Sequence, residues 1–274
     1  MRSPVPISDP QGALVASGAV RGVYQFIFAA KTSSLSQCLL RGGDVTPVDF
    51  TYAFWAVLGE FGVVLVDSGF GQDVARRRGI TYQRRPVEAL AALGVSATDV
   101  TDVVLTHLHF DHAGGLVDFP AARIHLQRSD LSFYTGPYMR FPQCSGALEQ
   151  ADLGALSRAE AEGRLNLLDG GARLGEGIVV HHVGGHTPGS QVVDVTTEEG
   201  RVVLASDVAH LYDNLASGTP FPVLHDLPSC CQAFETVSRF AEAGAVVVPG
   251  HDGRVMDRFP RVEGDGSSFV VRLI

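Results

Sequence analysis

The sequence is short of basic residues, and this excludes one large class of partners. It contains 21 lysine and arginine residues against 30 aspartate and glutamate residues, a formal net charge of -9. Binding to nucleic acid requires a basic face that neutralises phosphates, so we expect no nucleic-acid partner. The basic clusters at residues 76–78 and 84–85 are typical of solvated loops or of side chains that pair with acidic neighbours.

Cysteines are also few, and they do not have the spacing of a zinc finger. The four are Cys38, Cys144, Cys230 and Cys231. A disulfide between the adjacent Cys230 and Cys231 would be strained, so we expect reduced thiols in a cytosolic compartment.

The sequence has neither a long apolar run nor a secretion signal at its start. The apolar stretch at residues 22–30 is far too short to span a bilayer. We therefore expect a soluble cytoplasmic protein, monomeric or homodimeric, without membrane insertion. With 274 residues, 45% of them hydrophobic, and 31 glycines, the chain is typical of a compact, loop-rich enzyme. Residues 1–18 are predicted to form a loose lead-in and residues 19–274 a single domain.

Apolar runs separated by turn residues predict the secondary structure. We expect strands at residues 20–28, 52–58, 63–67, 99–106, 122–126, 165–168, 178–182, 191–193, 202–207 and 245–249. Helices are predicted at residues 86–94, 128–134 and 157–162, the last because Ser157 and Glu160 have the spacing of a capping box. His125 lies inside an apolar run, which favours a hydrogen-bonded core histidine.

The densest group of ligand-type side chains is the string THLHFDHAGG at residues 106–115, directly after an apolar strand. Divalent metals such as zinc bind imidazole nitrogen and carboxylate oxygen. Alternate side chains of an extended segment point the same way, so His107 and His109 can share one ion. Asp111 and His112, where the chain turns, can face a second ion. Independent surface or core histidines would rarely occur in this order.

The H-x-H-x-D-H order after a strand resembles the signature of the metallo-β-lactamase superfamily of metal-dependent hydrolases. The longer string THLHFDHAGG is most similar to its N-acyl-homoserine lactonase branch. The resemblance covers nearly the whole chain, and it implies an α/β (α+β) fold of the αββα sandwich type, with two sheets between outer helices.

Further candidate ligands follow other predicted strands. Glycines on both sides of His186, in the string GGHTPGS, free the backbone to present its ring beside His107 and His109; His181 and His182 are weaker candidates. The resemblance implies that Asp207 bridges two metals and that His251 joins Asp111 and His112. It also implies that Asp67 supports the ligand loop by hydrogen bonds, although an ordinary turn-forming aspartate remains an alternative.

The resemblance implies two divalent metal ions, with zinc as the expected metal and iron, manganese or cobalt as alternatives. A hydroxide between two such ions can attack a carbonyl carbon while the second ion stabilises the oxyanion. Asp111 is the candidate that moves the proton. In the lactonase branch a tyrosine commonly lies three residues after the bridging aspartate. Here that position is His210, and Tyr212 lies two residues further on. Either could contact the substrate, or both could simply pack beneath it.

The expected substrate is a small molecule with an apolar acyl part. Segments 135–153 and 211–228 carry aromatic residues without clear periodicity, so they could line an acyl groove or could be packed surface loops. The candidate lining residues are Phe70, Phe110, Tyr138, Met139, Phe141 and Phe221. The favoured hypothesis is a lactonase that opens N-acyl-homoserine lactones. The alternatives are another hydrolase of this fold that acts on an ester, a thioester or another lactone, and iron-dependent redox chemistry.

Overall fold

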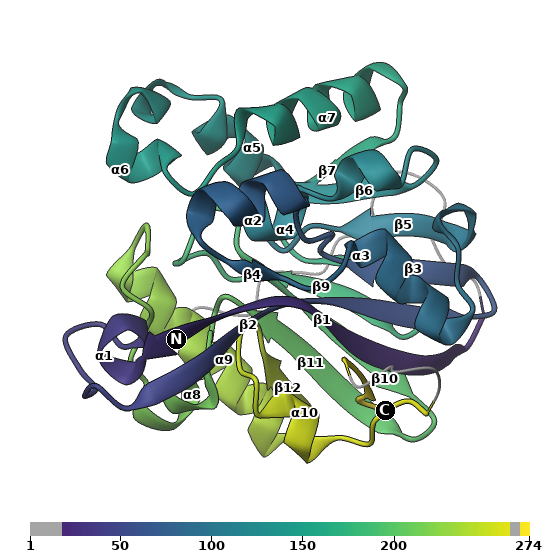
Figure 1. The fold of residues 1–274 in the computed structure, drawn as a ribbon. Coiled ribbons are helices and arrows are strands. Elements are labelled where there is room, and N and C mark those ends of the chain that lie inside the picture. Colours follow the sequence, from purple (N-terminus) through teal and green to yellow (C-terminus); the bar gives the residue numbers. More distant parts are fainter. Residues whose placement is uncertain (1–17, 264–268) are drawn as a thin grey trace.

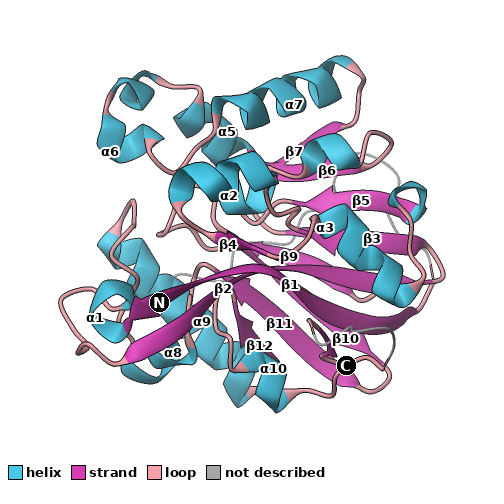
Figure 2. Cartoon of the chain, viewed as in Figure 1, coloured by secondary structure: helices cyan, strands magenta, loops and turns pink. Residues whose placement is uncertain are grey.

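The computed structural model describes residues 18–263 and 269–274. These residues form two β-sheets stacked between outer helices, which confirms the predicted αββα sandwich (Figures 1 and 2). The predicted lead-in, residues 1–18, lies outside the described residues except for Gly18.

The first sheet contains eight of the described strands in the order β13-β1-β2-β3-β5-β6-β7, with β4 paired to β1. Their bounds are β1 Val20–Ser34, β2 Pro47–Gly59, β3 Gly62–Val66, β4 Thr81–Tyr82, β5 Val100–Val104, β6 Arg123–Gln127, β7 Leu165–Leu168 and β13 Val270–Arg272. Strand β2 begins at Pro47, five residues before the start of the strand predicted at residues 52–58. The long antiparallel pair β1 and β2 is curved by irregularities in register, one of them between Ile27 and Ala29.

The second sheet has the order β12-β11-β10-β9-β8 among the described strands. Its strands are β8 Ala172–Gly175, β9 Ile178–His182, β10 Gln191–Thr197, β11 Gly200–Ser206 and β12 Val246–Pro249. Strands β11 and β12 are parallel, as are β3, β5 and β6 in the first sheet. Parallel neighbours end at the same edge, so the loops after these strands meet there.

Helices cover the outer faces of both sheets. Figure 1 shows α2, α3 and α7 over the first sheet, and α8 and α9 along the second. The α-helices are α1 Leu35–Cys38, α2 Gln72–Arg78, α3 Pro86–Ala89, α4 Phe110–Ala113, α5 Arg128–Tyr134, α6 Pro142–Ser145, α7 Gln150–Ala161, α8 Tyr212–Ser217, α9 Leu227–Glu242 and α10 Val255–Arg258. Short 3-10 turns, η1 Leu90–Leu93, η2 Ala97–Asp99, η3 Leu116–Asp118 and η4 Pro137–Arg140, complete the described elements.

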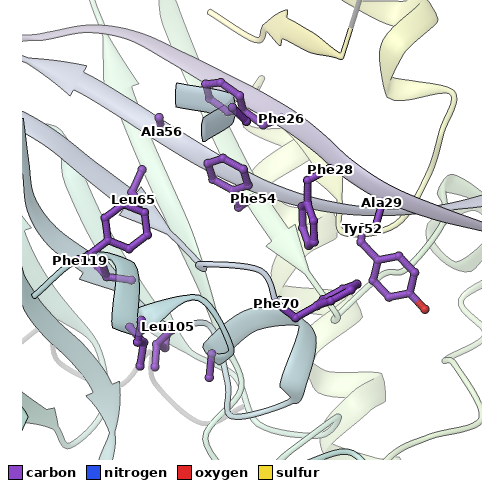
Figure 3. Packing of buried hydrophobic residues seen from close by; sticks show 14 of the residues in the cluster. Phe26, Phe28, Ala29, Tyr52, Phe54, Ala56, Leu65, Phe70, Leu105 and Phe119 are labelled. Carbon is purple, nitrogen blue, oxygen red and sulfur yellow. The ribbon is translucent and has the colours of Figure 1, made fainter. Parts of the chain in front are cut away.

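Three apolar clusters fill the spaces between these four layers. One joins the first sheet to its helices and includes Phe28, Phe54 and Phe70 (Figure 3). The second lies between the sheets, where Trp55 is fully buried, and the third joins the second sheet to α9. Because the middle cluster draws residues from both sheets, the two halves of the chain share one core.

The first of the two segments in which we found no clear periodicity is largely helical. Residues 135–153 contain η4, α6 and the first turn of α7. Helix α7 begins at Gln150 rather than at the predicted cap, Ser157, so that prediction was wrong. Ser157 lies in mid-helix, where its hydroxyl donates to the carbonyl of Leu153 at 2.9 Å. A serine followed three residues later by glutamate can also lie inside a helix, where its hydroxyl bonds to a carbonyl one turn earlier. The sequence alone does not distinguish this position from a cap.

Replacing Asp152 of α7 by Asn should make stability less dependent on pH. Asp152 is 6% exposed, and burial raises the pKa of its carboxyl to about 7. The folded protein then keeps this proton to a higher pH than the unfolded chain, so its stability falls as the pH rises from about 4 to about 7. We expect Asp152→Asn to match the parent near pH 4 and to be more stable above pH 7, by roughly 2 to 4 kcal/mol. Urea unfolding at both pH values tests this, and a difference that does not change with pH would contradict it.

Other expectations have mixed outcomes. The helix predicted at residues 86–94 is found as α3 followed by η1, and it ends at Gly94 with a positive φ of 68°. His125 is a core histidine as predicted, because its Nε2 lies 2.8 Å from Asp102 Oδ1.

The cysteines are free thiols. Residues 76–78 belong to helix α2 rather than to a loop, and Arg77 and Arg78 pair with Glu149. Within the described ranges we find no helix of the length and apolarity that a membrane span requires.

Candidate metal centre

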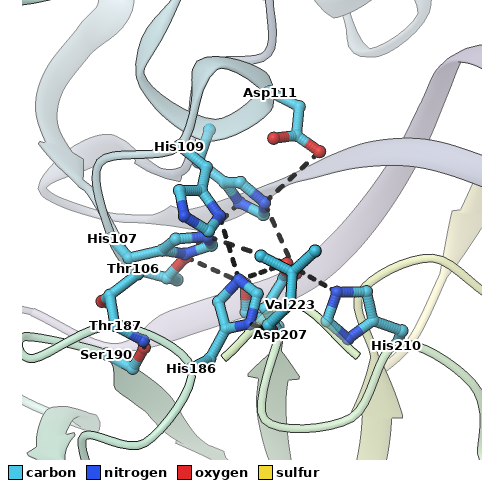
Figure 4. Close-up of polar contacts among 12 residues, drawn as sticks. Thr106, His107, His109, Asp111, His186, Thr187, Ser190, Asp207, His210 and Val223 are labelled. Atoms are coloured by element: carbon cyan, nitrogen blue, oxygen red, sulfur yellow. Dashed lines mark hydrogen bonds and ion pairs between the residues drawn. The ribbon is translucent and has the colours of Figure 1, made fainter. Parts of the chain in front are cut away.

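Loops at one edge of the sandwich bring the predicted ligands together (Figure 4). The loop after β5 carries His107 and His109 and leads into α4 with Asp111 and His112. The other candidate ligands come from the second sheet: His186 follows β9, Asp207 follows β11 and His251 follows β12. Ser206, the last residue of β11, has a positive φ of 46°, an uncommon conformation for a residue with a side chain. The chain thus turns sharply where β11 delivers Asp207.

One ligand set consists of three imidazoles and one carboxylate oxygen. The ligand atoms of His107, His109, His186 and Asp207 all lie within 4.8 Å of one another. Oδ2 of Asp207 is 3.2 Å from Nε2 of His186 and 3.7 Å from Nε2 of His107. Nδ1 of His109 lies 3.0 Å from Nε2 of His186. These groups could hold one metal ion in a nitrogen-rich site.

A second set lies beside the first. Asp111, His112 and His251 place one ligand atom each within 4.8 Å of the others. Oδ1 of Asp207 is 2.9 Å from Nε2 of His251 and 3.4 Å from Nε2 of His112. The two oxygens of Asp207 thus face different ligand sets, which is the arrangement that a bridging carboxylate requires.

Hydrogen bonds behind the ligands fix the orientation of their rings. Nδ1 of His112 lies 2.7 Å from Oδ2 of Asp67. Nδ1 of His186 donates to the carbonyl of Val223 at 2.8 Å, and Nδ1 of His251 donates to the carbonyl of Thr51 at 2.7 Å. Each contact places the ring proton on Nδ1, so Nε2 keeps its lone pair for a metal.

Asp67 supports the ligand loop as well as His112. Its Oδ1 accepts from the backbone N–H of Thr106 at 2.7 Å, and its Oδ2 accepts from the Thr106 hydroxyl at 2.8 Å. Asp67 is fully buried and has a positive φ of 64°. The carboxylate therefore has donors on both oxygens, which fits the supporting position predicted for it rather than an ordinary turn.

The charge state of the cluster fits divalent cations. Burial and the neighbouring imidazoles, His112 first, lower the pKa of His107 well below its usual range, so its ring is neutral. The buried Nε2 atoms of His107 and His112 have no hydrogen-bond partner in the part of the chain that the structure describes. Burial opposes ionisation of Asp207, but the surrounding imidazoles, His210 first, outweigh it and hold the pKa of the carboxyl well below its usual range. Burial opposes protonation of His112, but the carboxylates of Asp67 and Asp207 outweigh it and raise the pKa of this imidazole well above its usual range, so a bound cation would displace a proton there. Buried imidazole nitrogens around a buried carboxylate are the donor set of a zinc-type site.

His210 and Tyr212, the two candidates for substrate contact, lie in different surroundings. Nε2 of His210 is 3.0 Å from Oδ2 of Asp207, and its ring stacks on Phe221 at 3.8 Å. Asp207, His210 and His251 also form a third group of close ligand atoms. Nδ1 of His210, unlike Nδ1 of His186 and His251, has no hydrogen-bond partner among the described residues, so we place the ring proton of His210 on Nε2, which donates to Asp207. The Tyr212 ring instead packs under the guanidinium of Arg258 at 3.8 Å and borders the core between the sheets. This packing argues against the catalytic role predicted for Tyr212.

The candidate lining residues also divide. Phe221 borders the cluster through His210, and the half-buried Phe110 packs against Tyr52 and Phe70. Tyr138 and Phe141 are 57% and 43% exposed, and Met139 packs against the core. Phe70 is fully buried in the first apolar cluster, so its predicted position on a groove wall was wrong. Phe70 follows a strand and precedes a glycine, and this pattern does not indicate whether the ring points into the core or toward the solvent.

Two contributors to the site were not predicted. Phe50 stacks on the His251 ring at 4.4 Å, and alternation within β2 would have placed it on the same face as Tyr52. Asp130, at the start of α5, accepts from Leu108 N at 2.8 Å and from Gly189 N at 2.6 Å. It thereby ties the loop of His107 and His109 to the loop of His186. Nothing in the local sequence indicates this role for Asp130.

Comparison with known proteins gives a consistent family. Residues 46–256 match the family described as Metallo-beta-lactamase superfamily. An N-acyl homoserine lactonase from a Bacillus species is 27% identical over 177 residues, which is 59% of this chain. One from Bacillus thuringiensis is 26% identical over 179 residues, also 59% of this chain. In each case the match spans 65% of the relative's own length.

Solved structures show the same fold at lower identity. A quorum-quenching N-acyl homoserine lactone lactonase superposes with a TM-score of 0.70 at 20% identity, covering 86% of this chain and 94% of the other. AidC, a dizinc quorum-quenching lactonase, gives 0.69 at 18% identity, with 85% and 90% covered.

Proposed function

Because the chain belongs to the metallo-beta-lactamase superfamily, we propose that it is a metal-dependent hydrolase that opens the lactone ring of N-acyl-homoserine lactones. The observation that carries the proposal is Asp207, whose two oxygens face two separate sets of buried ligands. The names of the matched relatives support the lactone as substrate.

The site would hold two divalent ions, with zinc as the favoured metal. His107, His109 and His186 would hold one, Asp111, His112 and His251 the other, and Asp207 would bridge them. Two such ions, when bound, lower the pKa of water and polarise a carbonyl oxygen. The carboxylates of Asp111 and Asp207 would balance part of their charge.

The protein's own residues then orient the reaction. Asp111 is 8% exposed, and its Oδ2 lies 3.7 Å from Nε2 of His112 and 3.8 Å from Nε2 of His251. In the proposed reaction this buried carboxylate would accept a proton from water and pass it to the leaving alkoxide. His210 donates to Asp207 and so holds the bridging carboxylate in position. Phe221 and Phe50, against His210 and His251, keep bulk water from those two rings.

Hydrolysis of acyl-homoserine lactones by the purified, zinc-loaded protein tests the proposal. Ring opening releases a proton, so turnover can be followed at weak buffering with short and long acyl chains, and with an ester and a thioester in parallel. We expect rapid lactone opening that falls to the background rate in His109→Ala.

The matched control is His181→Asn. His181 is hydrogen-bonded to Asp194 at 3.3 Å and is absent from the candidate ligand sets, so its replacement should leave lactone turnover and zinc content close to those of the parent. Activity confined to the ester or the thioester would reject the lactone as substrate and keep the hydrolase.

A further inference from the structure

Lys31 is the only lysine in the 274-residue chain, and it lies beside the candidate metal centre. It is near the end of β1, directly opposite Phe50 in the register with β2. Its ammonium lies over the Phe50 ring, 4.7 Å from the centroid, and 5.9 Å from the centroid of the Tyr52 ring. The two aromatic faces hold the cation by cation–π attraction, and the side chain is exposed.

The same two rings contact a predicted metal ligand. Phe50 stacks on His251 at 4.4 Å with an interplanar angle of 18°, and Tyr52 meets His251 edge-on at 5.6 Å. Only one aromatic ring therefore separates the ammonium from the ligand cluster. A substrate whose carbonyl reached the metals could place another of its groups at Lys31.

The rings of Phe50, Tyr52 and Phe110 form an aromatic wall, because Tyr52 contacts both of the others. A second cation lies at the Phe110 end of this wall, but it is paired with a carboxylate. The guanidinium of Arg78 lies 3.8 Å from the Phe110 centroid. Its Nε and Nη2 donate to Glu149 at 3.1 and 2.9 Å, and Nη2 also donates to the Gly146 carbonyl at 3.1 Å. Lys31, by contrast, forms no ion pair with any carboxylate of residues 18–263 or 269–274. Of these two cations, Arg78 is therefore paired with a carboxylate, and within the described residues Lys31 is not.

We propose that Lys31 binds a carboxylate at the far end of the substrate's acyl part, while the scissile carbonyl lies at the metal centre. A single ammonium, with its N–H groups free to donate, matches one carboxylate better than a dianionic phosphate. The Phe50 and Tyr52 rings are only 4% and 3% exposed, so they would hold the ammonium in position rather than line the path of the apolar chain. This inference rests on the proposed hydrolase function, and it narrows the substrate class from apolar acyl groups to acyl groups that end in an anion.

Paired substrates give the kinetic test. N-hexanoyl-homoserine lactone is compared with the analogue whose six-carbon acyl chain ends in a carboxylate. We expect the carboxylate to raise kcat/KM for the parent, and Lys31→Met to lose about tenfold on this substrate only. Lys31→Arg should keep the preference, and added salt should weaken it.

The control is Arg21→Met. It removes a charge from the same strand, at an exposed ion pair with Glu60, and should change kcat/KM on neither substrate. Equal losses on both substrates in Lys31→Met would overturn the inference.

A binding test on the metal-free protein separates this inference from the proposed function. Trinitrobenzenesulfonate modifies amines, and Lys31 is the only side-chain amine, so subtracting the signal of Lys31→Met isolates its rate. We expect the carboxylate-ended lactone to slow this modification and the hexanoyl lactone to leave it unchanged. Equal effects of the two would reject the Lys31 site. If the zinc-loaded enzyme opens neither lactone, the proposed function fails, and the labelling result still decides whether Lys31 binds a carboxylate.

Discussion

Asp207→Asn should leave at most one equivalent of metal per chain and reduce hydrolysis to the background rate. Each oxygen of the parent carboxylate faces its own ligand set, at 3.2 Å from His186 and 2.9 Å from His251. An amide has one oxygen and one NH2 group, so it can offer a lone pair to only one side. It also removes the negative charge that would lie between two cations. Metal content after gel filtration, measured by mass spectrometry, and lactone turnover are the readouts.

Loss of any buried carboxylate could destabilise the fold, so a matched variant is needed. Asp194 is as exposed as Asp207, at 6%, but it pairs with Arg201 at 2.6 Å and is absent from the candidate ligand sets. Asp194→Asn should lower the melting temperature while keeping two metals and full turnover. Two tightly bound metals in Asp207→Asn would reject the bridging role.

Asp67→Asn should weaken metal binding by about 10- to 100-fold and leave the fold intact. Asp67 accepts hydrogen bonds from Thr106 N, the Thr106 hydroxyl and Nδ1 of His112. In the variant an NH2 group must face one of these donors, so either the loop or the His112 ring moves. Asparagine tolerates the positive φ of 64° at this position, and the variant therefore isolates the loss of the acceptor from backbone strain. Competition with a chelator measures the affinity.

Asp67→Ala separates the two effects. It removes both acceptor oxygens, whereas asparagine keeps one, and it also places alanine at a positive φ, which costs roughly 1 to 2 kcal/mol more. We expect both variants to lose metal affinity but only the alanine variant to lose this additional stability. Unchanged chelator competition in Asp67→Asn would show that the turn geometry alone, without the charge, supports the loop.

The ligands could be predicted from two sources: the residues of the THLHFDHAGG string indicate a metal site by themselves, and the family resemblance implied the roles of Asp207 and His251 at later strand ends. His107, Asp207 and His251 each come shortly after an apolar run, and the fold places these run ends at one edge. What could not be predicted depends on pairing between distant segments. Asp130 ties Leu108 to Gly189, and neither partner is near it in sequence.

The direction of individual side chains also could not be predicted from the sequence. His210 and Tyr212 are two residues apart, but α8 begins at Tyr212, and the turn into the helix sends that ring toward Arg258. Helix α9 was missed, although Asp226 caps it by accepting from Ser229 N at 2.8 Å and a proline follows near its start. Aspartate before proline and an amphipathic run are a usable signal for a helix start.

The placement of the ligands on both sheets has a consequence for folding. His107, His109, Asp111 and His112 follow a strand of the first sheet, whereas His186, Asp207 and His251 follow strands of the second. Bound metals would act as a removable cross-link between the two halves, closing a loop that runs from His107 to His251. The unfolded chain has no such assembled site, so metal binding would favour the native state, by about 4 kcal/mol at a thousandfold excess over Kd. The concentration of available metal would then determine the stability of the native state as well as the rate of hydrolysis.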